Sequence, residues 1–209
     1  MTPSPPGPLV QALTALWDEL RSDTPDLPPV RMAIVTGPQP TRHGQDRWTE
    51  DDSGLVSGLV VSTETLTAGP AAVVDVFYHE AAHILAWRRG IRDTTRRDGS
   101  YHNKQYLAVA EEIGLTQPPG TPASRVRGFT PVLPDDVRNR HTDAMRGLEA
   151  ILPSELPLLA PPAPSGKSSP DRQMLQCSCE IPRKLRVSPR VAAKGPILCG
   201  VCGQPFTSP

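Results

Sequence analysis

The stretch FYHEAAHILAWRRG, residues 77–90, decides the fold, because it places polar groups in the most apolar segment of the chain. It holds two of the five histidines, His79 and His83, with Glu80 directly after the first. Residues 71–87 are apolar on most of the circumference of a helix, which predicts a central helix rather than a surface one. Burying these polar side chains without partners would cost several kcal/mol, and a bound metal ion would remove that cost.

The spacing of the two histidines has a chemical reason. Positions i and i+4 share one helix face, with Cβ atoms about 5–6 Å apart, so both imidazoles can reach one zinc ion at about 2.0–2.1 Å. Zinc lowers the pKa of a bound water from 15.7 towards about 7, and a carboxylate beside it can take the proton and later pass it to a leaving amine. HEAAH therefore predicts a hydrolytic zinc centre with Glu80 as the general base.

A catalytic zinc site generally takes three protein ligands. The candidates for the third are the other histidines and two nearby carboxylates: His43, His102, His141, Glu111 and Glu112. His102 is the best placed, since it comes 19 residues after His83, just before a helix that we predict over residues 104–113. His43 and His141 lie in polar segments, so we expect exposed positions for them.

The order HEAAHILAW, then a basic loop, then YHNKQYLAVAEEIGL resembles the SprT-like zinc metallopeptidase family over roughly residues 10–117. The upstream segment GLVVSTETL is similar to the family's strand that precedes the active helix and flanks the cleft. In the family a glycine follows the third histidine, whereas here Asn103 stands at that position.

The resemblance implies that His79, His83 and His102 bind a catalytic zinc ion and that Glu80 activates water. Tyr101 or Tyr106 would then support the oxyanion or pack beneath the metal, and packing is the role that we expect for each.

The C-terminal tail, CSCEIPRKLRVSPRVAAKGPILCGVCGQPF, contains all four cysteines. The pattern Cys199-Gly-Val-Cys202-Gly is typical of a zinc knuckle, because glycines let backbone amides fold back onto the thiolate sulfurs. Cys177 and Cys179 lie closer together but can still bind, so we predict a ribbon with a closed, structural four-cysteine zinc site. The alternative is two unrelated cysteine pairs, oxidised or free. SprT-like proteins often carry such a ribbon.

Formal net charge is zero, but the charge is unevenly distributed. Residues 1–85 carry 4 basic and 11 acidic side chains, residues 86–106 carry 6 and 2, and residues 165–209 carry 7 and 2. The basic segments are either solvated faces or contacts for a phosphate backbone. We expect a protein substrate, and non-specific DNA as a partner of the ribbon and of the loop at 88–104. Phe206 is the tail's only aromatic residue, which argues against base stacking.

The N-terminus lacks the basic and apolar regions of a secretory signal, and no segment approaches the roughly 20 apolar residues of a membrane span. We therefore expect a cytoplasmic protein that does not enter membranes. In a reducing compartment four cysteines are better interpreted as metal ligands than as disulfides.

The pattern along the chain predicts an α+β fold. An amphipathic helix begins near residue 9, with one apolar stripe formed by Val10, Leu13, Leu16, Trp17 and Leu20. Strands are predicted at residues 30–35 and 55–61, and Gly58 within the second permits close approach of another backbone. With a further short strand, they would form a small sheet against which the active-site helix packs, as in zincin-like metalloproteases.

Four regions follow from composition and patterning. We predict a metallopeptidase domain at residues 9–117, a helical extension at 118–152, a flexible proline-rich linker at 153–170 and a zinc ribbon at 171–209.

The leading hypothesis is a zinc metalloprotease, with one catalytic and one structural zinc ion, that acts on DNA-associated proteins. The alternatives are a non-catalytic zinc-binding adaptor for nucleic acid or protein, and a regulatory protease with one dedicated substrate. The oligomeric state does not follow from the sequence.

Overall fold

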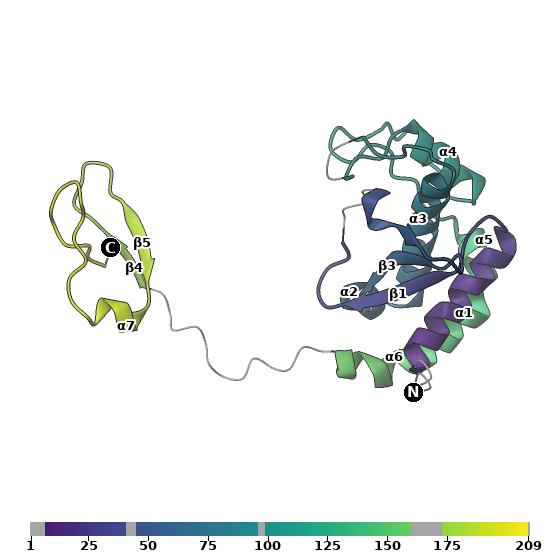
Figure 1. The fold of residues 1–209 in the computed structure, drawn as a ribbon, viewed down its shortest axis with the longest axis horizontal. Coiled ribbons are helices and arrows are strands. Elements are labelled where there is room, and N and C mark those ends of the chain that lie inside the picture. The colour runs from purple at the N-terminus through teal and green to yellow at the C-terminus, as the bar shows by residue number, and fades with distance from the viewer. Residues whose placement is uncertain (1–6, 41–44, 96–98, 160–172, 209) are drawn as a thin grey trace. The chain divides into compact units, whose positions relative to one another are not determined.

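The computed structural model describes residues 7–40, 45–95, 99–159 and 173–208. The chain forms two compact units, Met1–Ala160 and Pro161–Pro209 (Figure 1). The first unit combines helices with a small sheet, which confirms the α+β class.

The first unit contains the following elements, in chain order: α1 (Pro8–Asp23), β1 (Val30–Val35), the 3-10 helix η1 (Gln45–Arg47), β2 (Thr49–Glu50), β3 (Val56–Ser62), α2 (Thr63–Ala68), α3 (Pro70–Arg88), α4 (Lys104–Glu112), α5 (Asp135–Arg138), the 3-10 helix η2 (Asn139–His141) and α6 (Thr142–Leu159). The strand order is β1-β3-β2, with β1 parallel and β2 antiparallel to the central β3. Helices α3 and α4 pack against each other, and α1 packs against α6.

Helix α3 is the centre of this unit, as its apolar circumference predicts. Its buried residues include Val73, Phe77, Ala81, Ile84 and Leu85. A helix with buried residues around most of its circumference must be covered by other elements on several sides. Helices α1, α2, α4 and α6 and strand β3 contact α3 and provide this cover. Glu80 and His83 are thereby placed within the core, and His79 lies half-buried at its edge.

The buried stripe of helix α1 is the one expected except at its first residue, where Leu9 takes the place of Val10. Leu9 is buried together with Leu13, Leu16, Trp17 and Leu20, whereas Val10 is 36% exposed. Leu9 completes an i, i+4, i+7, i+8, i+11 pattern, and Val10 lies beside it on the outer side.

The indole of Trp17 joins α1 to the rest of the core. Its ring meets Phe77 of α3 edge-on at 5.4 Å between centroids, and its Nε1 donates to the Pro28 carbonyl at 3.0 Å.

Gly58 has the role that the sequence predicts for it. Its φ is +117°, and a Cβ there would lie 2.7 Å from the Arg47 carbonyl oxygen and 2.8 Å from Cε3 of Trp48. The pairing of β1 with β3 shifts at this point. A side chain at residue 58 would thus push the chain before β2 away from β3.

The segment GLVVSTETL is only in part a strand, which corrects its assignment. β3 ends at Ser62, whose side chain accepts from the Thr65 amide at 2.9 Å and caps α2. The hydroxyl offers the backbone a helical start, so residues 63–68 form a helix instead of continuing the strand.

The start of the predicted linker needs correction, and only the later part of the predicted extension is helical. Residues 118–134 form no helix; they return to the body of the unit, where Thr116 and Val132 exchange two backbone hydrogen bonds of 2.9 Å. The linker does not begin at 153, because α6 continues to Leu159 through Pro153 and Pro157.

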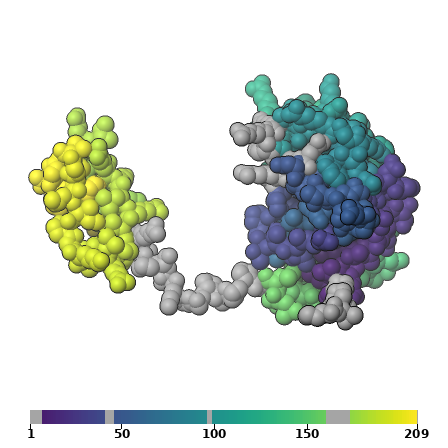
Figure 2. Space-filling view, viewed as in Figure 1, coloured from purple at the N-terminus to yellow at the C-terminus, as the bar shows by residue number. Residues whose placement is uncertain are grey.

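Packing explains why α6 continues through its two prolines. Leu148 and Leu152 are buried, Leu156 and Leu159 pack on the same core, and this stripe outweighs the two lost backbone hydrogen bonds. Figure 2 shows the side chains of α6 (green) next to those of α1 (purple).

His141, expected to be exposed, is buried. Its Nε2 lies 2.9 Å from the Tyr78 hydroxyl and its Nδ1 lies 3.2 Å from a carboxylate oxygen of Glu19. The polar helix surface that suggested exposure faces α1 and α3, where both ring nitrogens find partners. His43 lies outside the described residues.

The second unit is a small hairpin-based domain. β4 (Gln173–Gln176) pairs antiparallel with β5 (Lys184–Val187), and α7 (Pro189–Ala192) follows. Among the helices of the described residues, none combines the length and the apolar character that crossing a membrane requires.

The α6 stripe gives a test with an internal control. Leu148 is fully buried and Leu158, on the same helix, is 77% exposed. We expect Leu148→Ala to lower the free energy of unfolding by about 2–5 kcal/mol, and Leu158→Ala by less than about 0.5 kcal/mol. Denaturant unfolding followed by tryptophan fluorescence measures both, because all three tryptophans lie in the first unit. Equal effects of the two substitutions would contradict the packing of α6.

Candidate metal centres

Three histidines converge in the first unit. His79 and His83 project from α3, and His102 comes from the loop before α4. One potential ligand atom from each lies within 4.8 Å of those of the other two. The ring centroids are 4.9–5.0 Å apart in all three pairs. This arrangement can hold a metal ion with three nitrogen ligands.

The Nδ1 atoms of the two α3 histidines have hydrogen-bond partners. Nδ1 of His83 lies 2.5 Å from a carboxylate oxygen of Asp93, and both side chains are buried. Nδ1 of His79 lies 2.8 Å from the Tyr106 hydroxyl. Burial, and then the charge of Asp93, raises the pKa of Tyr106, so this hydroxyl stays protonated. With Nδ1 as the bonded atom, Nε2 is the atom that each ring can offer to a metal.

His102 is held in the same manner by a backbone group. Its Nδ1 lies 3.1 Å from the carbonyl oxygen of Phe129. The His102 amide donates to the Arg127 carbonyl at 2.9 Å, and the His102 carbonyl accepts from the Phe129 amide at 3.1 Å. Tyr106 stacks on the imidazole at 4.1 Å between centroids. Desolvation lowers the pKa of His102, which favours the neutral ring that a metal requires.

Gly128 allows this close approach. A Cβ at residue 128 would lie 1.9 Å from the His102 carbonyl oxygen, and its φ of +75° is one that side-chain-bearing residues rarely adopt. The loop after α4 can thus pack directly on the backbone of a candidate ligand only because residue 128 has no side chain.

Asn103 anchors the loop at the start of α4. Its side-chain oxygen accepts from the amides of Gln105 at 2.8 Å and Tyr106 at 3.1 Å, and its side-chain nitrogen donates to the Arg92 carbonyl at 2.7 Å. The residue has φ of −90°, so glycine is not needed here. The departure from the SprT-like pattern therefore supplies a helix cap that also ties the loop to itself.

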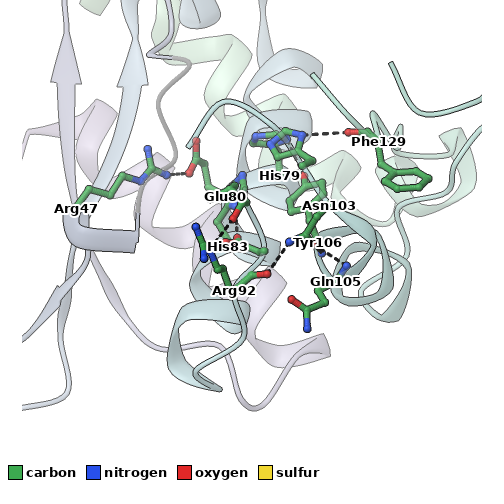
Figure 3. A network of polar contacts seen from close by, with 12 residues as sticks. Arg47, His79, Glu80, His83, Arg92, Asn103, Gln105, Tyr106 and Phe129 are labelled. Carbon is green, nitrogen blue, oxygen red and sulfur yellow. Dashed lines mark hydrogen bonds and ion pairs between the residues drawn. The ribbon is translucent and has the colours of Figure 1, made fainter. Parts of the chain in front are cut away.

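Glu80 lies beside the histidines and lines the same cleft as His79 and His102. The cleft has a volume of about 320 Å³, and its wall includes His79, Glu80 and His102. The Glu80 side chain is 1% exposed and forms an ion pair with Arg47. Figure 3 shows these groups together: the carboxylate lies between the Arg47 guanidinium and the imidazole rings.

The other candidates for the third ligand lie elsewhere. Glu112 binds Arg89 with oxygens at 2.7 and 2.8 Å, and Glu111 is exposed. His141 belongs to the network with Tyr78. Of the two tyrosines, Tyr106 packs under the rings and contacts His79, while Tyr101 is half-buried in the preceding loop.

The four cysteines of the second unit form another group. One sulfur from each of Cys177, Cys179, Cys199 and Cys202 lies within 4.8 Å of the others. None forms a disulfide, and the Cys179 and Cys199 sulfurs are 3.8 Å apart. A tetrahedral ion with sulfur ligands at about 2.3 Å requires sulfurs about 3.8 Å apart, so this spacing fits a metal ion better than two separate pairs.

Backbone amides surround the buried sulfurs. Hydrogen bonds from the amides of Cys202 and Val201 lower the pKa of the Cys199 thiol to about 6. The amide of Arg183 donates to the Cys177 sulfur at 3.2 Å. The backbone hydrogen bond from Cys179 and, to a lesser extent, that from Arg183 lower the pKa of the Cys177 thiol as well. These amides stabilise thiolates, the form in which cysteine binds metals.

Compared with family models, curated proteins and solved structures, the chain matches none.

The sequence analysis did not identify the groups that hold two of the histidines and Glu80. Asp93 carried a signal, since it is one of two acids in a basic loop, and a buried histidine on a helix needs an acceptor. Arg47 and the Phe129 carbonyl carried none, because 33 and 27 residues separate them from their partners.

Metal analysis tests the histidine centre. We expect two metal ions per wild-type chain and one in His102→Ala, because two imidazoles alone hold an ion weakly. Elemental analysis of the purified full chain gives the number. His141→Gln, which alters another buried histidine, should retain two. Two ions in His102→Ala would exclude His102 as a ligand.

Gly128→Ala should also reduce the metal content, although Gly128 is not itself a candidate ligand. The added methyl group would displace the His102 backbone, and we expect the metal content to fall by one ion per chain. Gly120→Ala is the matched control, since its φ is +73° but nothing lies within 4 Å of a new Cβ. It should cost about 1 kcal/mol of stability and leave the metal bound. Equal metal contents in the two variants would contradict the role of Gly128.

Proposed function

We propose that the chain is a zinc-dependent metallopeptidase of the SprT-like type, with a zincin-like catalytic domain and a zinc ribbon. The observation that carries the proposal is the convergence of three histidines beside Glu80 at an accessible cleft. Three nitrogen ligands are the number typical of catalytic zinc, and each ring is oriented through its other nitrogen.

A structural zinc site explains these features less well. Structural sites are closed by four protein ligands, whereas the histidine group of the described residues has three members and includes the half-buried His79 in the cleft wall. A structural site also has no use for a carboxylate held next to its ligands.

The chemistry assigned to each residue follows from its place. Zinc held by His79, His83 and His102 would act as a Lewis acid on a peptide carbonyl and lower the pKa of water towards about 7. Glu80 accepts the proton of the attacking water on its carboxylate and later donates it to the leaving amine nitrogen. The carboxylate of Asp93 accepts from Nδ1 of His83 and so holds that imidazole in the tautomer that leaves Nε2 for the metal, and the Tyr106 hydroxyl orients the ring of His79 through Nδ1.

The ribbon supports a role in contacting DNA. Within its described part, residues 173–208, the basic side chains are exposed: Arg183, Lys184, Arg186, Arg190 and Lys194. Glu180 is the only acid among residues 177–209. Such a surface suits a phosphate backbone without reading sequence, so we propose that the protease acts on DNA-associated proteins in the cytoplasm.

The adaptor function has its own support. Ile181 and Val201, at the tips of the two cysteine loops, are largely exposed. Exposed apolar residues next to a basic surface suit a macromolecular partner, and an adaptor would need only this unit.

Glu80→Gln separates the two functions. The amide keeps the shape of the side chain but cannot take a proton, so we expect hydrolysis to fall by roughly 10²–10⁴-fold. The assay uses a fluorescently labelled unstructured protein, with and without DNA, and metal content is measured in parallel. The control, Glu111→Gln, changes an exposed carboxylate and should keep full activity. A wild-type chain with two bound ions that cleaves nothing in either condition would favour the adaptor.

A further inference from the structure

The ion pair between Arg47 and Glu80 is almost completely removed from water. The side chains are 18% and 1% exposed, and Nη2 of Arg47 contacts Oε2 of Glu80. A buried carboxylate without a cation is strongly unfavourable, and so is the opposite case. The two residues therefore depend on each other for burial, although 33 positions separate them in the chain.

The guanidinium of Arg47 also contacts the aromatic ring of Trp48. The guanidinium carbon of Arg47 lies 3.9 Å from the centroid of the Trp48 ring, a cation–π geometry, and Trp48 is itself buried. Both residues are pressed against Gly58 of β3, where a Cβ would clash with each. Arg47 is thus fixed from the sheet, and Glu80 is fixed from α3.

We propose that Arg47 is a positioning residue for the carboxylate of Glu80. This inference rests on the proposed function, since it assigns a role within that reaction. A glutamate on a helix has several rotamers, and a general base acts only when its oxygen is within hydrogen-bond distance of the proton that it takes. The planar guanidinium binds Oε2 and thereby sets the direction of the carboxylate relative to the histidines (Figure 3).

Two other roles for Arg47 predict different results. A restraint that holds Glu80 away from the reaction would make the variant enzyme faster. A purely structural partner would lower stability and leave kcat unchanged in the folded protein. Positioning predicts that kcat falls while the Michaelis constant and the bound metal remain unchanged.

A double-mutant cycle tests the pair without any catalysis. The variants are Arg47→Ala, Glu80→Gln and the double substitution in the full chain, with chelator and reductant present, unfolded by denaturant. Tryptophan fluorescence reports on the first unit alone. We expect Arg47→Ala to raise the unfolding equilibrium constant at least about tenfold more in the wild-type background than in the Glu80→Gln background. Equal effects in both backgrounds would overturn the inference, whatever the chain catalyses.

Kinetics then decide the role. Misplacement of a catalytic group by about 1 Å can cost roughly 10²-fold, so we expect a fall in kcat of that order in Arg47→Ala. Methylguanidinium added to this variant should restore part of the activity, and methylammonium should not, since it lacks the planar fork. Arg31→Ala is the control, because Arg31 lies in β1 with its side chain 66% exposed.

Arg47→Lys keeps the inference testable if Arg47→Ala does not fold. It retains the charge but not the fork, and its kcat should lie between those of the wild type and Glu80→Gln. An unchanged or raised kcat in a metal-loaded variant, or a loss that methylguanidinium does not repair, would refute positioning. An inactive wild type that still shows coupling in the cycle would instead refute the proposed function and leave the ion pair established.

Discussion

The hydrogen bond between His83 and Asp93 is the interaction on which the candidate catalytic centre depends. Both side chains are buried, so each would be unfavourable without the other. Asp93 also accepts the amide of Asn103 on its backbone oxygen at 3.0 Å, and the loop between them brings His102 to α3. One residue therefore sets the tautomer of one candidate ligand and the position of the next.

Much of the fold follows from local patterns, and the differences arise where packing or capping decides. The helices corresponding to α1, α3 and α4 were predicted because apolar periodicity is a local property. Helix α2 was missed because a serine cap overrides the strand-like residues after it. The end of α6 was misplaced because its prolines argue locally for a linker, whereas its leucines find partners only in the folded unit.

The candidate site divides in the same way. The HEAAH motif could be recognised from the sequence, because helix geometry alone brings His79 and His83 to one face. His102 could be chosen by its place before a helix. Its partner, the Phe129 carbonyl, could not, since every residue carries a carbonyl and only the fold selects this one. The same holds for Arg47. It meets Glu80 only because the segment of Arg47 and Trp48 packs closely on Gly58 of β3 in the folded unit.

With a divalent ion bound, the two candidate metal centres would differ in charge, and this difference supports the roles proposed for them. Four thiolates around a divalent ion leave a net negative site, which backbone amides such as that of Arg183 stabilise. Three neutral imidazoles would leave the full positive charge of a bound ion, which is the condition for polarising a carbonyl in the proposed reaction.

Glu80 lies next to the candidate histidine centre, between the imidazoles and the guanidinium of Arg47. A neighbouring cation favours the ionised form of a buried carboxylate, which is the form that can accept a proton. The buried cation of Arg47 and the candidate metal centre would therefore act on Glu80 in the same direction.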